Sequence, residues 1–166
     1  LMALPPLLIV KPFAKESFRW LPLYVLSLLA VASHLALDWT NVYAIRLLLP
    51  FSDRWLRADI THVVDAWILL ALGLAIAAPW LSRLVSSEIG APKTRGRGSA
   101  IVALLFLLAY DGVRWVSHDR AIEMLNSRMY EGAAPLRVAA FPNAFWPFTW
   151  TGYTETAQAV GLHRVD

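Results

Sequence analysis

The sequence has 166 residues, of which 58% are hydrophobic and only 16% are charged, with a mean hydropathy of +0.51 and a net charge of +3. A soluble domain has roughly 45–50% apolar and about 25% charged residues, and one small core cannot hold such an apolar excess. The composition therefore excludes a disordered chain and argues against a soluble globular one. The absence of cysteine excludes disulfides, thiolate nucleophiles and Cys-ligated zinc.

Three segments are long and apolar enough to cross a bilayer, which takes about 20 predominantly apolar residues. They are residues 20–36, 60–81 and 99–116. The eight tryptophans and five tyrosines fit the aromatic belts found at membrane interfaces. The sequence therefore predicts a mainly α, polytopic membrane helical bundle with about three spans, and a membrane domain over residues 1–116.

The chain becomes amphipathic after Ser117, which predicts a C-terminal extramembrane extension over residues 117–166. Residues 119–130 predict a short surface helix that Gly132 and Pro135 end. Residues 136–141 and 148–160 predict short strands on either side of a proline-rich kink. The extension is therefore expected to be partly β.

Basic residues predict the orientation in the membrane, because cytoplasmic loops carry an excess of Lys and Arg. They gather before the first span and between the second and third, at Lys11, Lys15, Arg19, Arg83, Lys93, Arg95 and Arg97. Three spans place both regions on one side. We therefore expect a multi-pass protein of the bacterial inner membrane, with the loop 37–59 and the C-terminal extension facing the periplasm. The lipid bilayer is the expected partner, and nucleic acid is not, because no aromatic residues interleave the basic residues of the connection over 83–98.

Ionisable side chains gather at the same end of all three predicted spans. They are His34 and Asp38 on the first span, Asp59, His62 and Asp65 on the second, and Asp111, Arg114 and His118 on the third. Their spacings of three and four residues predict that each set shares one helical face. Charges inside a span are costly, so this convergence favours a functional site over random anchoring.

Metal binding is the chemistry that these residues support. His34 and Asp38, four residues apart on a helix, project two ligands toward one ion. A second helix that delivers Asp65, and in one alternative His62 as well, would complete three or four nitrogen and oxygen ligands. Such sites suit zinc, manganese or iron, and an ion with an open position activates water. We expect a divalent metal, with zinc favoured.

Residues 33–67 carry a family resemblance. The pattern consists of Ser33, His34 and Asp38, then Thr40 and Tyr43, then residues 50–54 (PFSDR), and finally residues 65–67 (DAW). In these motifs the chain resembles a bacterial inner-membrane, metal-dependent hydrolase family that includes a LexA-regulated group. Pro147, Phe148 and Trp150 match the family's tail motif. Ala44 replaces the family's turn glycine, and the upstream His-Arg-Gly-x-Thr-His-Ser motif is missing, so we expect a chain truncated at its N-terminus.

The leading hypothesis is a membrane-embedded, metal-dependent hydrolase that acts at the outer membrane face on a small molecule or lipid. Its metal ligands would be His34, Asp38 and Asp65. Asp59 or His62 would be the general base or would orient a ligand. Arg54 and Arg57 would bind an anionic group such as a lipid phosphate, or would instead pair with Asp53 and Asp59.

The alternative hypothesis is a non-catalytic membrane scaffold or a transporter fragment. The same polar groups would then form a hydrogen-bonded cluster between helices. An ion pathway is disfavoured, because residues 69–80 contain no polar side chain. The tail residues Trp146, Trp150 and Tyr153 are expected at the membrane interface, although they would also suit a cover over the site.

Overall fold

The computed structural model describes residues 20–89 and 96–166, in two compact units that divide between Arg57 and Ala58. Each unit is described by itself. The basic residues Lys11, Lys15, Arg19, Lys93 and Arg95, on which part of the predicted orientation rests, lie outside the described residues.

The first unit consists of helix α2 (Trp20–Thr40) and a loop over residues 41–57. α2 begins where the sequence predicts and continues four residues beyond the predicted end at residue 36. In its last turn the Thr40 hydroxyl donates to the carbonyl of Leu37 at 2.8 Å, which satisfies one of the carbonyls that a helix end leaves open. The loop is closed by paired backbone hydrogen bonds between Ile45 and Leu56, both 2.8 Å.

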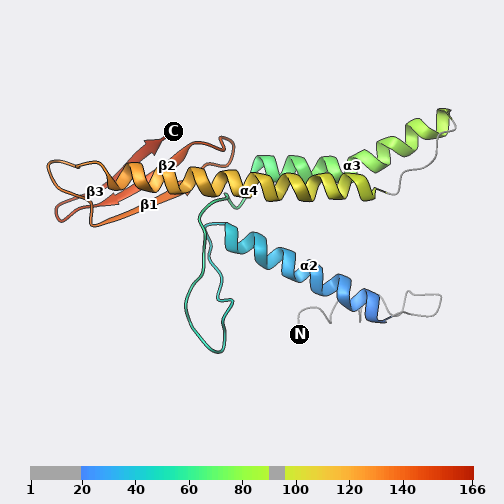
Figure 1. Cartoon of the computed structure of the whole chain (residues 1–166), viewed down its shortest axis with the longest axis horizontal. Coiled ribbons are helices and arrows are strands. Elements are labelled where there is room, and N and C mark those ends of the chain that lie inside the picture. Colours follow the sequence, from blue (N-terminus) through green and yellow to red (C-terminus); the bar gives the residue numbers. More distant parts are fainter. Residues whose placement is uncertain (1–19, 90–95) are drawn as a thin grey trace. The chain divides into compact units, whose positions relative to one another are not determined.

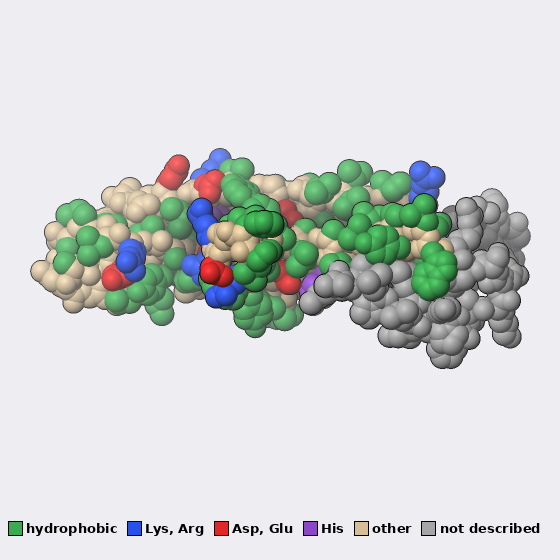
Figure 2. Space-filling view, turned by 90° about the horizontal axis from the view of Figure 1, so that it is seen from below, with side chains coloured by type: hydrophobic (Ala, Val, Ile, Leu, Met, Phe, Trp, Pro, Cys, Tyr) green, Lys and Arg blue, Asp and Glu red, His purple; other side chains and the backbone are tan. Residues whose placement is uncertain are grey.

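The helices of the second unit are α3 (Ala66–Ile89) and α4 (Arg97–Asn126), which lie side by side (Figure 1). They are antiparallel, because the Ser99 hydroxyl near the start of α4 donates to the Ala75 carbonyl while Tyr110 reaches Asp65, just before α3. Among the described residues, three helices are long and apolar enough to span a membrane: Trp20–Thr40, Ala66–Leu84 and Arg97–Asn126. Hydrophobic side chains cover much of the helix surface on the face that Figure 2 shows.

Two helix boundaries correct the sequence prediction. α3 begins at Ala66 rather than at residue 60, because Asp65 stops the helix from extending further back. α4 runs unbroken for 30 residues, so the third span and the predicted surface helix are one helix, and the connection over 83–98 is shorter than expected. The division at residue 116 stays a prediction about where the bilayer ends along α4.

The chain ends in a three-stranded antiparallel sheet of order β1-β2-β3, formed by β1 (Arg137–Pro142), β2 (Trp150–Glu155) and β3 (Val160–Val165). Trp150 pairs with Pro142 on one side and Val165 on the other. β1 and β2 confirm the predicted strands, whereas most of β3 was not predicted. The description "mainly α" is therefore too simple: three apolar helices are joined to a C-terminal sheet.

The sheet packs against the C-terminal half of α4. Ala121 and Leu125 of α4 form a buried core with Ala140, Trp150 and Val165. β2 approaches the helix so closely that a Cβ added at Gly152 would lie 2.7 Å from a methyl group of Leu125. A larger residue at position 152 would clash with Leu125. The close packing at this position and the buried core attach the sheet to the helix that carries the third span.

Candidate functional site

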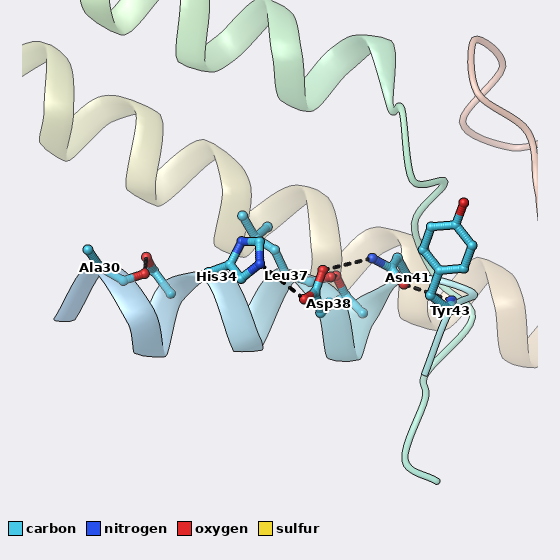
Figure 3. A network of polar contacts seen from close by, with 8 residues as sticks. Ala30, His34, Leu37, Asp38, Asn41 and Tyr43 are labelled. Atoms are coloured by element: carbon cyan, nitrogen blue, oxygen red, sulfur yellow. Dashed lines mark hydrogen bonds and ion pairs between the residues drawn. The ribbon is translucent and has the colours of Figure 1, made fainter. Parts of the chain in front are cut away.

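The first candidate ligands, His34 and Asp38, face each other on the last turns of α2 (Figure 3). Histidine Nε2 lies 3.3 Å from a carboxylate oxygen of Asp38, which confirms that the two side chains share a helical face. The His34 side chain is 75% exposed and that of Asp38 35%. The pair is therefore open to a ligand from outside the helix.

A short chain of hydrogen bonds continues from Asp38 into the loop. The Asn41 amide donates to the Asp38 carboxylate at 3.4 Å, and the Asn41 carbonyl oxygen accepts the backbone N–H of Tyr43 at 2.8 Å (Figure 3). The next residue, Ala44, has a φ of 64°. The turn thus keeps a left-handed conformation at the position where Ala44 replaces the turn glycine of the resembled family, and it does so at a steric cost.

The arginines expected to bind an anion lie in the loop over residues 41–57. Arg54 is exposed, and its backbone N–H donates to the Ser52 hydroxyl at 3.3 Å. The carboxylate of Asp53 lies 3.9 Å from Arg46, whose guanidinium also stacks 4.4 Å from the ring centre of Trp55. Asp53, which the sequence offered as a partner for Arg54 or Arg57, therefore lies next to Arg46.

Asp59, His62 and Asp65 do not share a helical face, in contrast to the prediction, because residues 59–65 are not helical. Asp59 has a φ of 54°. His62 Nδ1 lies 3.1 Å from the backbone nitrogen and 3.3 Å from the carbonyl oxygen of Val64. The spacing of three residues therefore does not place these side chains on one helical face.

Asp65 is the N-cap of α3 and is only 2% exposed. Its Oδ1 accepts the backbone N–H groups of Trp67 and Ile68 at 3.1 and 3.3 Å. The hydroxyl of Tyr110 on α4 lies 3.0 Å from both carboxylate oxygens. A carboxylate at this position satisfies open N–H groups and complements the positive end of the helix dipole.

Arg114 of α4 is fully buried and joins three parts of the second unit. Its Nε donates to the carbonyl of Ile60 at 2.7 Å, and its Nη1 donates to the carbonyl of Pro147. The guanidinium stacks 4.5 Å from the ring centre of Trp150, whose indole N–H donates to the Ser117 hydroxyl at 3.1 Å. The helix, the segment before α3 and the loop before β2 are thereby held together.

We call Asp65, Tyr110, Arg114, Ser117 and Trp150 the Arg114 cluster. The sequence analysis placed Asp65 and Arg114 at one end of their spans, which the Tyr110 contact confirms. It missed Tyr110 and Ser117, and it placed Trp150 at the interface, whereas Trp150 is 1% exposed. The available signal was Arg114 itself, because an arginine in an apolar span must turn toward polar partners.

The two polar regions differ in what they offer a metal ion. His34 and Asp38 present one nitrogen and one oxygen donor at an exposed position. Asp65 uses both of its oxygens on protein donors. Within residues 20–89 and 96–166, no group of three or more His, Asp or Glu side chains lies close enough to hold an ion. The described residues therefore contain no complete set of metal ligands.

Residues 1–121 match the model of a family described as YdjM inner membrane protein. The match covers α2, α3 and most of α4, including the His34–Asp38 pair and the members of the Arg114 cluster other than Trp150, and it ends before the sheet. Neither a curated protein nor a solved structure matches the chain. With the matched region covering well over half of the sequence and three apolar helices of spanning length, the chain belongs to the YdjM inner membrane protein family and is a multi-pass inner membrane protein.

Proposed function

We propose that this chain is a membrane-embedded, metal-dependent hydrolase in which His34 and Asp38 supply two of the metal ligands. The observation that carries the proposal is their distance. Two tetrahedral ligands, each about 2.1 Å from a zinc ion, lie about 3.4 Å apart. His34 Nε2 and Asp38 Oδ2 are 3.3 Å apart and accessible, so their separation is compatible with two ligands of one ion. Manganese and iron accept the same donors.

Asp65 is the third proposed ligand, through Oδ2. Oδ1 accepts two backbone N–H groups at the start of α3, whereas Oδ2 accepts the Tyr110 hydroxyl. Metal binding would therefore require Tyr110 to shift its hydrogen bond to Oδ1. This requirement makes the third ligand the most demanding part of the proposal.

A metal in such a site supplies a Lewis acid that activates water for attack on an ester. In the proposal, Asp59 or His62 accepts the proton of that water. His62 can do so at Nε2 only in the tautomer whose Nδ1 carries the hydrogen and donates to the Val64 carbonyl, because in the other tautomer Nδ1 accepts the Val64 N–H and Nε2 carries the hydrogen. Arg54 and Arg57 would hold an anionic group, which makes a phosphate ester, on a lipid or a small molecule, the proposed substrate class.

The test is the amount of zinc, manganese and iron bound per protein, measured by elemental analysis of protein purified in detergent from its full reading frame. Asp38→Asn keeps the volume but removes the charge that offsets an ion's desolvation, so we expect bound metal to fall by at least about tenfold. Asp53→Asn is the matched control, because Asp53 is an exposed aspartate outside the pair. Equal metal in all three proteins, or none in the wild type, would contradict the proposal.

A second candidate function is a non-catalytic membrane scaffold, which the Asp65–Tyr110 contact favours. Asp65 joins α3 to α4 through hydrogen bonds that need no ligand. In that case Asp65→Asn would weaken the helix pair without changing the metal content, and Asp38→Asn would change neither. The same set of variants therefore separates the two functions.

A further inference from the structure

The loop over residues 143–148, here called the aromatic loop, is fixed to the end of the helix pair. The backbone N–H of Ala66 donates to the Ala144 carbonyl at 3.0 Å, and the Trp67 indole donates to the Phe145 carbonyl at 3.0 Å. Arg114 donates to the Pro147 carbonyl. Three donors from α3 and α4 thus bind the carbonyls of Ala144, Phe145 and Pro147.

These contacts fix the depth of the loop relative to the bilayer. The apolar span of α3 begins at Ala66, which contacts the loop directly. On α4, a span of about 20 residues counted from Arg97 ends near residue 116. Arg114, which holds the other end of the loop, lies within one turn of that point. Both helices therefore place the aromatic loop at the membrane boundary.

The side chains of the aromatic loop point away from the protein. Phe145 is 70% exposed, Trp146 67% and Phe148 59%. Trp150, only two residues beyond the loop, is buried against Arg114. Large exposed apolar side chains gathered in one loop mark an interaction surface.

We propose that the aromatic loop inserts into the boundary between lipid headgroups and acyl chains, and so holds the C-terminal sheet against the membrane. Aromatic side chains favour this depth, where their rings meet the acyl chains and the indole N–H meets the headgroups. The inference rests on the spans and on the loop's contacts, and it is independent of the proposed hydrolase activity.

The bound surface is expected to be any phospholipid, whatever its headgroup charge. Besides the buried Arg114, the basic side chain Arg164 lies beside the loop, where it lines a pocket of about 270 Å³ together with Trp146 and Thr149. Arg164 is already paired, because its Nε lies 3.1 Å from the carboxylate of Asp166. Insertion therefore depends on the aromatic rings, and neutral and anionic vesicles should support it equally.

The test uses the absence of cysteine from the sequence. A nitroxide spin label at Phe145→Cys, in protein reconstituted into phosphatidylcholine vesicles, should collide with lipid-soluble oxygen and be protected from a water-soluble nickel complex. The control is Ala157→Cys in the exposed turn between β2 and β3, where the label should show the opposite preference. β2 separates the two sites by six residues, about 20 Å. Nickel access at position 145 equal to that at 157 would overturn the proposal.

A second measurement requires no label. Phospholipids with bromine near the headgroup end of their acyl chains should quench Trp146, seen as the loss of quenching in Trp146→Phe, more strongly than phospholipids brominated near the chain end. Equal quenching of both proteins would contradict insertion. Vesicles with anionic lipid should give the same result, and insertion only with anionic lipid would show that charge, not the aromatic loop, drives the contact.

Discussion

The His34–Asp38 pair and the Arg114 cluster are both polar groups in apolar helices, but their surroundings differ. The pair is exposed, and its hydrogen bonds stay within α2 and the loop that follows it. Arg114 is fully buried, and it contacts Ile60, Pro147 and Trp150 from three parts of the chain. The first region is open to solvent, whereas the second joins three parts of the chain. Equivalent substitutions in the two regions should therefore have different effects.

Arg114→Met should give the largest effect. The substitution keeps an apolar stem but leaves the carbonyls of Ile60 and Pro147 without their donor. Each buried acceptor that is left without a donor costs about 1–3 kcal/mol, and this substitution leaves two. We expect a corresponding fall in the free energy of unfolding, measured by denaturant titration in detergent micelles. Arg120→Met, at an exposed position on the same helix, is the control and should change stability little. A similar free energy of unfolding for both variants would contradict the structural role of Arg114.

Asp65→Ala and Asp38→Ala make the same change in the two regions. Asp65→Ala removes the cap of α3, worth about 0.5–2 kcal/mol, and the partner of a half-buried tyrosine hydroxyl, worth about 1 kcal/mol more. Asp38→Ala removes a contact between exposed groups, worth about 0–1 kcal/mol. Unfolding in micelles should therefore separate the variants by about 2 kcal/mol. If Asp38→Ala destabilises as much as Asp65→Ala, the contrast between the regions is wrong.

The next prediction concerns the packing that holds the sheet on α4. Gly152→Ala would place a Cβ 2.7 Å from a methyl group of Leu125, which is fully buried. Overpacking of this kind costs about 1–3 kcal/mol. Gly112→Ala is the matched control, because nothing lies within 4 Å of its added Cβ and alanine favours the helix. The two variants should shift the melting temperature in opposite directions.

The sequence predicts the helices and strands better than the contacts between them. Apolar runs identify the spans, because a bilayer demands a minimum apolar length. The start of α3 was missed, because residues 60–64 are as apolar as a helix start would be and only the capping contacts of Asp65 distinguish them. β3 was missed because residues 161–165 (GLHRV) do not alternate strictly between apolar and polar side chains.

The Arg114 cluster shows why part of the site lay beyond sequence reasoning. The position of Arg114 inside an apolar span indicated that its side chain has polar partners. Its hydrogen-bond acceptors, however, are main-chain carbonyls 54 and 33 residues away in sequence. Every residue has a carbonyl, so no residue type marks these partners. By contrast, the His34–Asp38 contact follows from helix geometry alone, and spacing predicted it.

The smallest expected effect tests the first unit through its backbone. Ala44 has a φ of 64°, a conformation that costs an alanine about 1–2 kcal/mol and a glycine almost nothing. Glycine loses more entropy on folding, about 0.4–1 kcal/mol, so Ala44→Gly should stabilise the unit by about 0.5–1 kcal/mol. Ala36→Gly, in the interior of α2, should instead destabilise it by about 1 kcal/mol. Unfolding of both variants in micelles measures the difference, and a loss of stability in both would show that the turn beside the His34–Asp38 pair is not left-handed. A gain for Ala44→Gly would mean that the alanine stores strain next to an exposed pair, in the region where the fold has least packing to compensate for it.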